Sequence, residues 1–145
     1  MIDKFDHAYM DVAARFGELS SAERLKVGCI IVKDDRIISI GYNGTPAGWD
    51  NCCEDVKKSG NTGYGRKLVT KPEVLHAETN AIAKVAKSTE SADGAEMYTT
   101  HAPCLECSKL IYQSGIKHVL YKEEYRDSDG LTLLKKLGLV ITKVE

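Results

Sequence analysis

Two short groups of residues could together hold a metal ion. The first is His76 with Glu78 two positions later, and the second is residues 103–107, which read Pro-Cys-Leu-Glu-Cys. Cys104 and Cys107 are three positions apart at the start of an expected helix, so both sulfurs lie on one face of it. The positive end of a helix dipole favours the thiolate form of cysteine, which is the form that binds metals.

Two thiolates and one imidazole are a suitable ligand set for zinc. Three protein ligands leave the fourth tetrahedral position to water, as in catalytic rather than structural zinc sites. We therefore expect His76, Cys104 and Cys107 to bind one Zn²⁺. Zinc lowers the pKa of bound water to about 7, and a nearby carboxylate can take the proton and return it to a leaving group. The pattern predicts hydrolysis with Glu78 as the general base.

Other uses of the cysteines and of a nearby histidine fit the sequence less well. A thioredoxin-like redox pair usually has its proline between the two cysteines, but Pro103 precedes both. A structural zinc site that adds Cys52 and Cys53 is awkward, because neighbouring residues rarely aim both sulfurs at one ion. Cys29 lies in an apolar run and is expected to be buried. His101 is expected to be an ordinary loop residue, and its place next to the metal-binding helix leaves a role at the mouth of the site as the alternative.

The composition is that of an ordinary globular protein. The chain has 145 residues, which is close to one domain of about 150 residues, so we expect a single domain over residues 1–145. The chain has 20 Lys and Arg and 21 Asp and Glu, giving a net charge of −1, which argues against nucleic-acid and membrane partners. Because no export signal or long apolar run is evident, we expect a cytoplasmic protein with free thiols.

Hydrophobic periodicity predicts the elements that position these groups. Residues 43–72 are rich in Gly, Asn, Asp, Lys and Pro, which predicts a long loop with a short helix near 53–58. Strand–helix–strand units in the second half favour parallel pairing, so an α/β fold with a mixed sheet is expected. The expected helices are 2–16, 73–87, 103–114 and 131–137, and the expected strands are 27–32, 36–42, 95–100, 116–121 and 139–144.

The two groups match the pattern H-x-E followed by P-C-x-x-C, which is typical of zinc-dependent nucleobase deaminases. With these residues the chain resembles the cytidine and deoxycytidylate deaminase superfamily over nearly its whole length, and within it the deoxycytidylate deaminases most closely. The resemblance implies a three-layer α/β/α fold with a five-stranded mixed sheet. It also rests on residues 26–28 (Lys-Val-Gly), 41–48 (Gly-Tyr-Asn-Gly-Thr-Pro-Ala-Gly), 114–117 (Ser-Gly-Ile-Lys) and 125–129 (Tyr-Arg-Asp-Ser-Asp).

The resemblance implies hydrolytic deamination of dCMP to dUMP and ammonia. Glu78 would pass a proton to N3 of cytosine and then to the departing amine. By the same resemblance, Asn43 would hydrogen-bond the sugar, the backbone N–H of Ala77 would hold the base carbonyl, and Tyr125 would border the pocket.

The 5′-phosphate of a nucleotide needs cationic partners. Arg24 and Lys26 alternate just before the first expected strand, so both would face one side of it and could bind the phosphate.

The resemblance further implies a homohexamer that dCTP activates and dTTP inhibits, with Asn43 and Gly44 at the effector site. Some relatives hold a second zinc through a cysteine before the first strand and a histidine-rich insertion. Here Ala22 stands at the cysteine position and the insertion is absent, so we expect one Zn²⁺ per chain.

Three other functions stay open at this point. A tRNA adenosine deaminase would need a basic surface near the pocket, which the net charge does not favour. A free-nucleoside cytidine deaminase typically uses three cysteines, which disagrees with His76. A non-catalytic nucleotide-sensing module of the same fold would have no need of Glu78.

Overall fold

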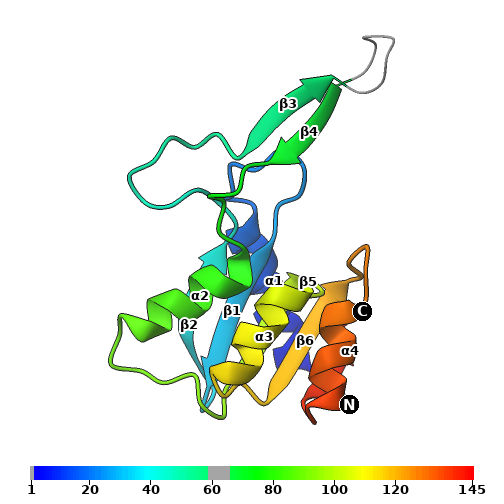
Figure 1. Cartoon of the computed structure of the whole chain (residues 1–145). Coiled ribbons are helices and arrows are strands. Elements are labelled where there is room, and N and C mark those ends of the chain that lie inside the picture. Colours follow the sequence, from blue (N-terminus) through cyan, green and yellow to red (C-terminus); the bar gives the residue numbers. More distant parts are fainter. Residues whose placement is uncertain (1, 59–65) are drawn as a thin grey trace.

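A five-stranded mixed sheet forms the centre of the molecule (Figure 1). The computed structural model describes residues 2–58 and 66–145. In chain order its elements are α1 (Lys4–Gly17), β1 (Gly28–Lys33), β2 (Arg36–Tyr42), β3 (Glu54–Lys58), β4 (Arg66–Thr70), α2 (Ala77–Ala86), β5 (Glu96–His101), α3 (Leu105–Gln113), β6 (His118–Glu123), α4 (Asp129–Lys136) and β7 (Val140–Lys143).

The strand order is β2-β1-β5-β6-β7, and the pairing changes direction across the sheet. β1 is antiparallel to both β2 and β5, whereas β5, β6 and β7 are parallel. The β1–β2 hairpin turns at Asp34 and Asp35, whose φ angles of 51° and 60° are those of a left-handed turn that follows the strand twist. The predicted hairpin and the predicted parallel half of the sheet are both confirmed.

Helices cover both faces of the sheet, which makes the three layers that were expected. On one face, Met10 and Ala13 of α1 pack against Ile30 and Tyr98. On the other face, α2, α3 and α4 bury a second apolar cluster against the sheet (Figure 1). Cys29 lies in this second cluster and is fully buried, as predicted.

The expected long loop contains a second, smaller sheet. β3 and β4 form an antiparallel pair that projects from the main body (Figure 1), so the short helix predicted near 53–58 is wrong. Val56 pairs with Leu68 across the two strands, but the strands are otherwise mostly polar, which leaves little alternation to see in the sequence. Residues 59–65 of the expected loop lie outside the described residues.

The second helix begins later than predicted, at Ala77 instead of position 73. Leu75 forms a short antiparallel bridge with Gly44, in which each backbone N–H donates to the other residue's carbonyl, at 2.8 and 3.1 Å. Extended backbone at Leu75 cannot also be helical, so the helix starts only after His76. None of the helices in the described residues is long and apolar enough to span a membrane.

β2 approaches α2 closely at Gly41, and this approach can be tested by substitution. A Cβ at this position would lie 2.3 Å from the Ala77 carbonyl oxygen and 2.7 Å from the Ala81 nitrogen. Because these are backbone atoms, α2 would have to move, so we expect Gly41→Ala to lower the free energy of unfolding by about 1–3 kcal/mol. Urea denaturation measures this change.

Gly44→Ala is the matched control, since an added Cβ there meets no atom within 4 Å. Its free energy of unfolding should stay within about 0.5 kcal/mol of the wild-type value. Equal losses in the two variants would show that the approach of β2 to α2 is not what requires glycine.

Candidate active site

The predicted metal ligands meet where two helices begin. His76 is the N-cap of α2, Cys104 is the N-cap of α3, and Cys107 lies in the first turn of α3. The backbone N–H of Cys107 donates to the Cys104 Sγ at 3.5 Å. Both cysteines therefore lie at the positive end of a helix dipole, which favours thiolates.

The three side chains fit a tetrahedral zinc ion. One ligand atom from each lies within 4.8 Å of the other two. The His76 Nδ1 is 3.2 Å from the Cys107 Sγ and 3.5 Å from the Cys104 Sγ. Zn–S bonds of about 2.3 Å and Zn–N bonds of about 2.0–2.1 Å place N and S ligands about 3.5 Å apart in a tetrahedron. The donor set and its spacing therefore match one Zn²⁺ bound through Nδ1.

Hydrogen bonds among the three ligand side chains shift their pKa values. Hydrogen bonds from Cys107 and His76 to the Cys104 sulfur lower the pKa of Cys104 to about 4. The bond to Cys104 and burial raise the pKa of Cys107, and the bond to Cys104 raises the pKa of His76. Each ligand must lose its proton to bind a metal. A bound divalent cation would therefore take the place of the protons in the hydrogen bonds among these three side chains.

Glu78 is the buried carboxylate of the site. Its side chain is 4% exposed, and its Oε1 accepts a hydrogen bond of 2.9 Å from the Thr99 hydroxyl. Burial raises the pKa of Glu78, while its own backbone N–H and Thr99 act in the opposite direction. The result is a carboxyl group that can both accept and release a proton, as a general base and acid requires.

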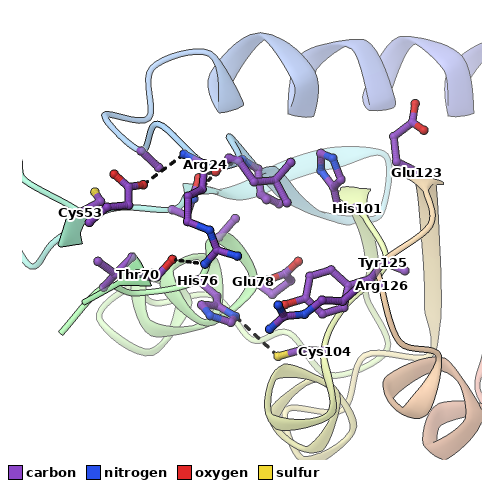
Figure 2. A pocket seen from close by; sticks show the side chains of 18 of the residues that line it. Arg24, Cys53, Thr70, His76, Glu78, His101, Cys104, Glu123, Tyr125 and Arg126 are labelled. Carbon is purple, nitrogen blue, oxygen red and sulfur yellow. Dashed lines mark hydrogen bonds between the residues drawn. The ribbon is translucent and has the colours of Figure 1, made fainter. Parts of the chain in front are cut away.

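A cavity of about 560 Å³ opens next to the ligands, a volume in the usual range for small-molecule sites. Figure 2 shows Glu78, His76 and Cys104 on its wall, with Arg24 and Thr70 on one side and Tyr125 and Arg126 on the other. The cavity therefore brings residues from α2, the start of α3, the ends of β5 and β6, the β3–β4 hairpin and several connecting segments around one space.

Four of the five residues predicted to bind substrate line this cavity, namely Arg24, Asn43, Ala77 and Tyr125, whereas Lys26 is not among the lining residues. The prediction that Arg24 and Lys26 share a face assumed extended backbone. The structure instead begins β1 at Gly28, so the alternation of a strand does not apply to the irregular segment before it.

The Asn43 side chain is engaged with the backbone of that irregular segment. Its Oδ1 accepts from the Val27 N–H at 2.8 Å, and its Nδ2 donates to the Leu25 carbonyl at 2.7 Å. The Asn43 amide therefore holds the backbone of Leu25 and Val27, two residues that line the cavity, in place. Nδ2 carries a second N–H, so a contact from Asn43 to a sugar stays a prediction.

Several lining residues were not found from the sequence. Glu54, Thr70 and Arg126 line the cavity, but the first two belong to the hairpin that was expected to be a loop. His101 was expected in a loop, yet it is the last residue of β5, it lines the cavity, and burial lowers its pKa.

Thr99 is a further residue that the sequence analysis missed. It lies on the same face of β5 as the buried Met97, and its side chain is fully buried. A hydroxyl at a core-facing position of a strand needs a polar partner, and this requirement is the signal that could have pointed to Glu78.

The zinc site can be tested by replacing one ligand. We expect Cys107→Ala to reduce the zinc content of the purified protein from one ion per chain to almost none. The variant should also unfold at a lower temperature, because metal binding contributes to folding free energy. Metal analysis by mass spectrometry and thermal unfolding measure the two effects.

Cys52→Ala is the control, since Cys52 is exposed and lies outside the ligand group. This variant should keep its zinc. Equal zinc contents in the two variants would contradict the assignment of Cys107 as a ligand.

Comparisons with known proteins agree with this geometry. The family model described as the cytidine and deoxycytidylate deaminase zinc-binding region matches residues 3–123. The crystal structure of dCMP deaminase from the cyanophage S-TIM5 in complex with dCMP and dUMP is 45% identical, with a TM-score of 0.87 over 99% of both chains.

Two curated relatives are longer proteins. The ComE operon protein 2 of Bacillus subtilis is 39% identical over 129 residues, which are 87% of this chain and 64% of that protein. The deoxycytidylate deaminase of Saccharomyces cerevisiae is 35% identical over 142 residues, which are 97% of this chain and 45% of that protein. The chain thus spans less than two thirds of either relative. The match over most of the sequence, joined to the His–Cys–Cys group, shows that the chain belongs to the cytidine and deoxycytidylate deaminase family.

Proposed function

We propose that the protein is a zinc-dependent enzyme that hydrolyses dCMP to dUMP and ammonia. The observation that carries this proposal is the buried carboxylate of Glu78 in the same cavity as His76 and Cys104, two of the three residues of the His–Cys–Cys group. A ligand set that leaves one zinc position open, next to a proton carrier, suits hydrolysis. The similarity to the dCMP deaminase of cyanophage S-TIM5 supports dCMP as the substrate.

Zinc, when bound, supplies Lewis-acid chemistry and lowers the pKa of a water molecule to about 7. Glu78 takes a proton from the water that attacks C4 of cytosine and delivers it to N3. Glu78 then carries the second proton of this oxygen to N4 as the C4–N4 bond breaks, so the amino group leaves as ammonia and the new C4–O bond becomes the uracil carbonyl. The Thr99 hydroxyl keeps Oε1 of Glu78 in place through these transfers.

The cavity also supplies groups that orient the base. Ala77 is the first residue of α2, so its backbone N–H has no acceptor in a preceding turn and can hold the base carbonyl. Tyr125 provides an aromatic wall on the other side, and the Arg126 guanidinium lies 5.7 Å from the centre of its ring.

For the 5′-phosphate, we assign Arg24 from the predicted pair, because Lys26 does not line the cavity. Arg24 donates from Nη1 to the Thr70 hydroxyl at 2.9 Å. A guanidinium has five N–H donors, so the others are available to phosphate oxygens. Arg126 offers a second cation from the opposite wall.

Regulation and assembly belong to the same proposal. We propose a cytoplasmic homohexamer that dCTP activates and dTTP inhibits through Asn43 and Gly44. The bridge between Gly44 and Leu75 supports this arrangement, because Leu75 directly precedes His76. A ligand that moved the Gly44 loop would move the backbone next to a metal ligand.

The three alternative functions differ in the substrate that each would use. A tRNA adenosine deaminase would act on RNA, a cytidine deaminase would prefer the free nucleoside, and a sensing module would bind nucleotide without turnover. A panel of dCMP, dCTP, CMP, deoxycytidine and tRNA, each with and without dCTP and dTTP as effectors, separates these functions.

Glu78→Gln tests the general base. Glutamine keeps the shape of the side chain but cannot carry the proton, so kcat for dCMP should fall by at least about 10²–10⁴-fold. Zinc content should be unchanged, because Glu78 is outside the ligand group. Ammonia release and metal analysis measure both quantities, and a variant with near wild-type turnover would refute the role.

Arg24→Ala tests the phosphate contact. The KM for dCMP should rise by about 10–100-fold, since hydrogen bonds to charged groups contribute about 1.5–3 kcal/mol. The KM for deoxycytidine should change little, because this substrate has no phosphate. Equal changes for the two substrates would exclude the contact.

A further inference from the structure

The base of the β3–β4 hairpin holds Arg24 at both its backbone and its side chain. Glu54 Oε1 accepts hydrogen bonds from the Glu23 N–H at 2.9 Å and from the Arg24 N–H at 3.3 Å. Thr70 Oγ1 accepts from the Arg24 guanidinium at 2.9 Å. Glu54 and Thr70 are directly paired across the two strands, so one pair of opposed residues binds Arg24 at two points. Figure 2 shows the bond between Thr70 and Arg24.

These hydrogen bonds matter because the segment that carries Arg24 has no regular structure. Residues 18–27 lie between α1 and β1, outside every helix and strand, so their backbone N–H groups need other partners. The Ser20 hydroxyl accepts from the Ala22 N–H, and the Asn43 side chain accepts from the Val27 N–H. Four residues lie between these points, and Glu54 accepts from the backbone N–H groups of two of them, one of which is Arg24.

Glu54 is built into the site and does not lie on the surface. Its side chain is 8% exposed and lines the cavity together with Arg24 and Thr70. A buried carboxylate is costly unless it is hydrogen-bonded, and the two backbone N–H groups provide those bonds. Its Oε1 is directed at the backbone of residues 23 and 24, which explains an acidic residue in a cavity proposed to take an anion.

The hydroxyl of Thr70 limits the freedom of the guanidinium. A free arginine side chain has many rotamers, and binding a ligand must restrict them. A guanidinium already bonded to Thr70 through one N–H keeps its other donors beside the cavity. Less ordering is then needed when a phosphate binds.

We propose that Glu54 and Thr70 are positioning residues that preorganise Arg24 for the 5′-phosphate and thereby set the preference for a nucleotide over a nucleoside. This inference rests on the proposed function, because it takes dCMP as the substrate. Neither residue contacts the reacting atoms, so both act on KM for the nucleotide and not on kcat.

Two pairs of variants test the inference in the full-length, zinc-loaded protein. Thr70→Val has nearly the same shape but loses the acceptor, and Glu54→Ala removes the carboxylate. Each should raise the KM for dCMP by about 5–20-fold, in line with the loss of a charge-assisted hydrogen bond, with kcat unchanged. Thr70→Ser and Glu54→Gln keep an oxygen acceptor and should return the KM to within about threefold of wild type.

Deoxycytidine serves as the internal control for folding. Its kcat/KM, together with the zinc content, should be the same in all four variants as in the wild type. A second readout is the Arg24→Ala background, in which Thr70→Val and Glu54→Ala should cause no further rise in the KM for dCMP. Only residues that act through Arg24 behave in this way.

The outcomes separate the two proposals. A wild-type protein that deaminates neither dCMP nor deoxycytidine overturns the proposed function, and this inference with it. If the wild type is active, two results overturn this inference alone. One is an equal effect of Thr70→Val on dCMP and deoxycytidine, and the other is a full additional effect in the Arg24→Ala background.

Discussion

The three zinc ligands can share one ion because their ligand atoms, which belong to residues at the starts of two helices, all lie within 4.8 Å of one another. The fold meets this requirement by placing the first residues of α2 and α3 side by side, next to the sheet. α2 packs on β1 and β2, and glycine at Gly41 lets its first turn come close to β2. α3 follows β5 directly, so the position of β5 decides where Cys104 lies. The metal ligands are therefore fixed by rigid elements and not by loops.

Glu78, the proposed proton carrier, is held in place by α2 and β5. Glu78 follows His76 by two residues, so the first turn of α2 sets the distance between the base and a ligand. Thr99 holds the Glu78 carboxylate from β5, and β5 continues to His101 just before the Pro103-Cys104 pair. Because β5 positions both Thr99 and the segment that carries Cys104, a shift of β5 would disturb the Glu78 carboxylate and the metal ligands together.

The metal ligands and Glu78 could be predicted because they lie in two short motifs, which can be recognised from residue spacing alone. Spacing within residues 76–78 and 103–107 named the ligands, and apolar periodicity located the five main strands. The hairpin was missed because its pairing depends on contacts between two short, polar strands that lie apart in the sequence. The start of α2 was misplaced because the bridge between Gly44 and Leu75, two residues 31 positions apart, keeps Leu75 extended. The hydrogen-bond partners of Thr99 and Arg24 lie on other elements, so these partners could not be assigned from the sequence, although the core-facing hydroxyl of Thr99 indicated that it needs one.

The site also divides into residues for chemistry and residues for recognition. The zinc ligands and Glu78 lie at the N-caps or in the first turns of helices packed against the sheet, whereas Arg24, Asn43 and Tyr125 lie in segments outside the helices and strands. Such segments tolerate sequence change without loss of the core. They can position a charge only where side chains from elsewhere bind their backbone, as Asn43 and Glu54 do for residues 23–27. Under the proposed function, substrate preference therefore depends on the hydrogen bonds that tie these irregular segments to the rest of the fold.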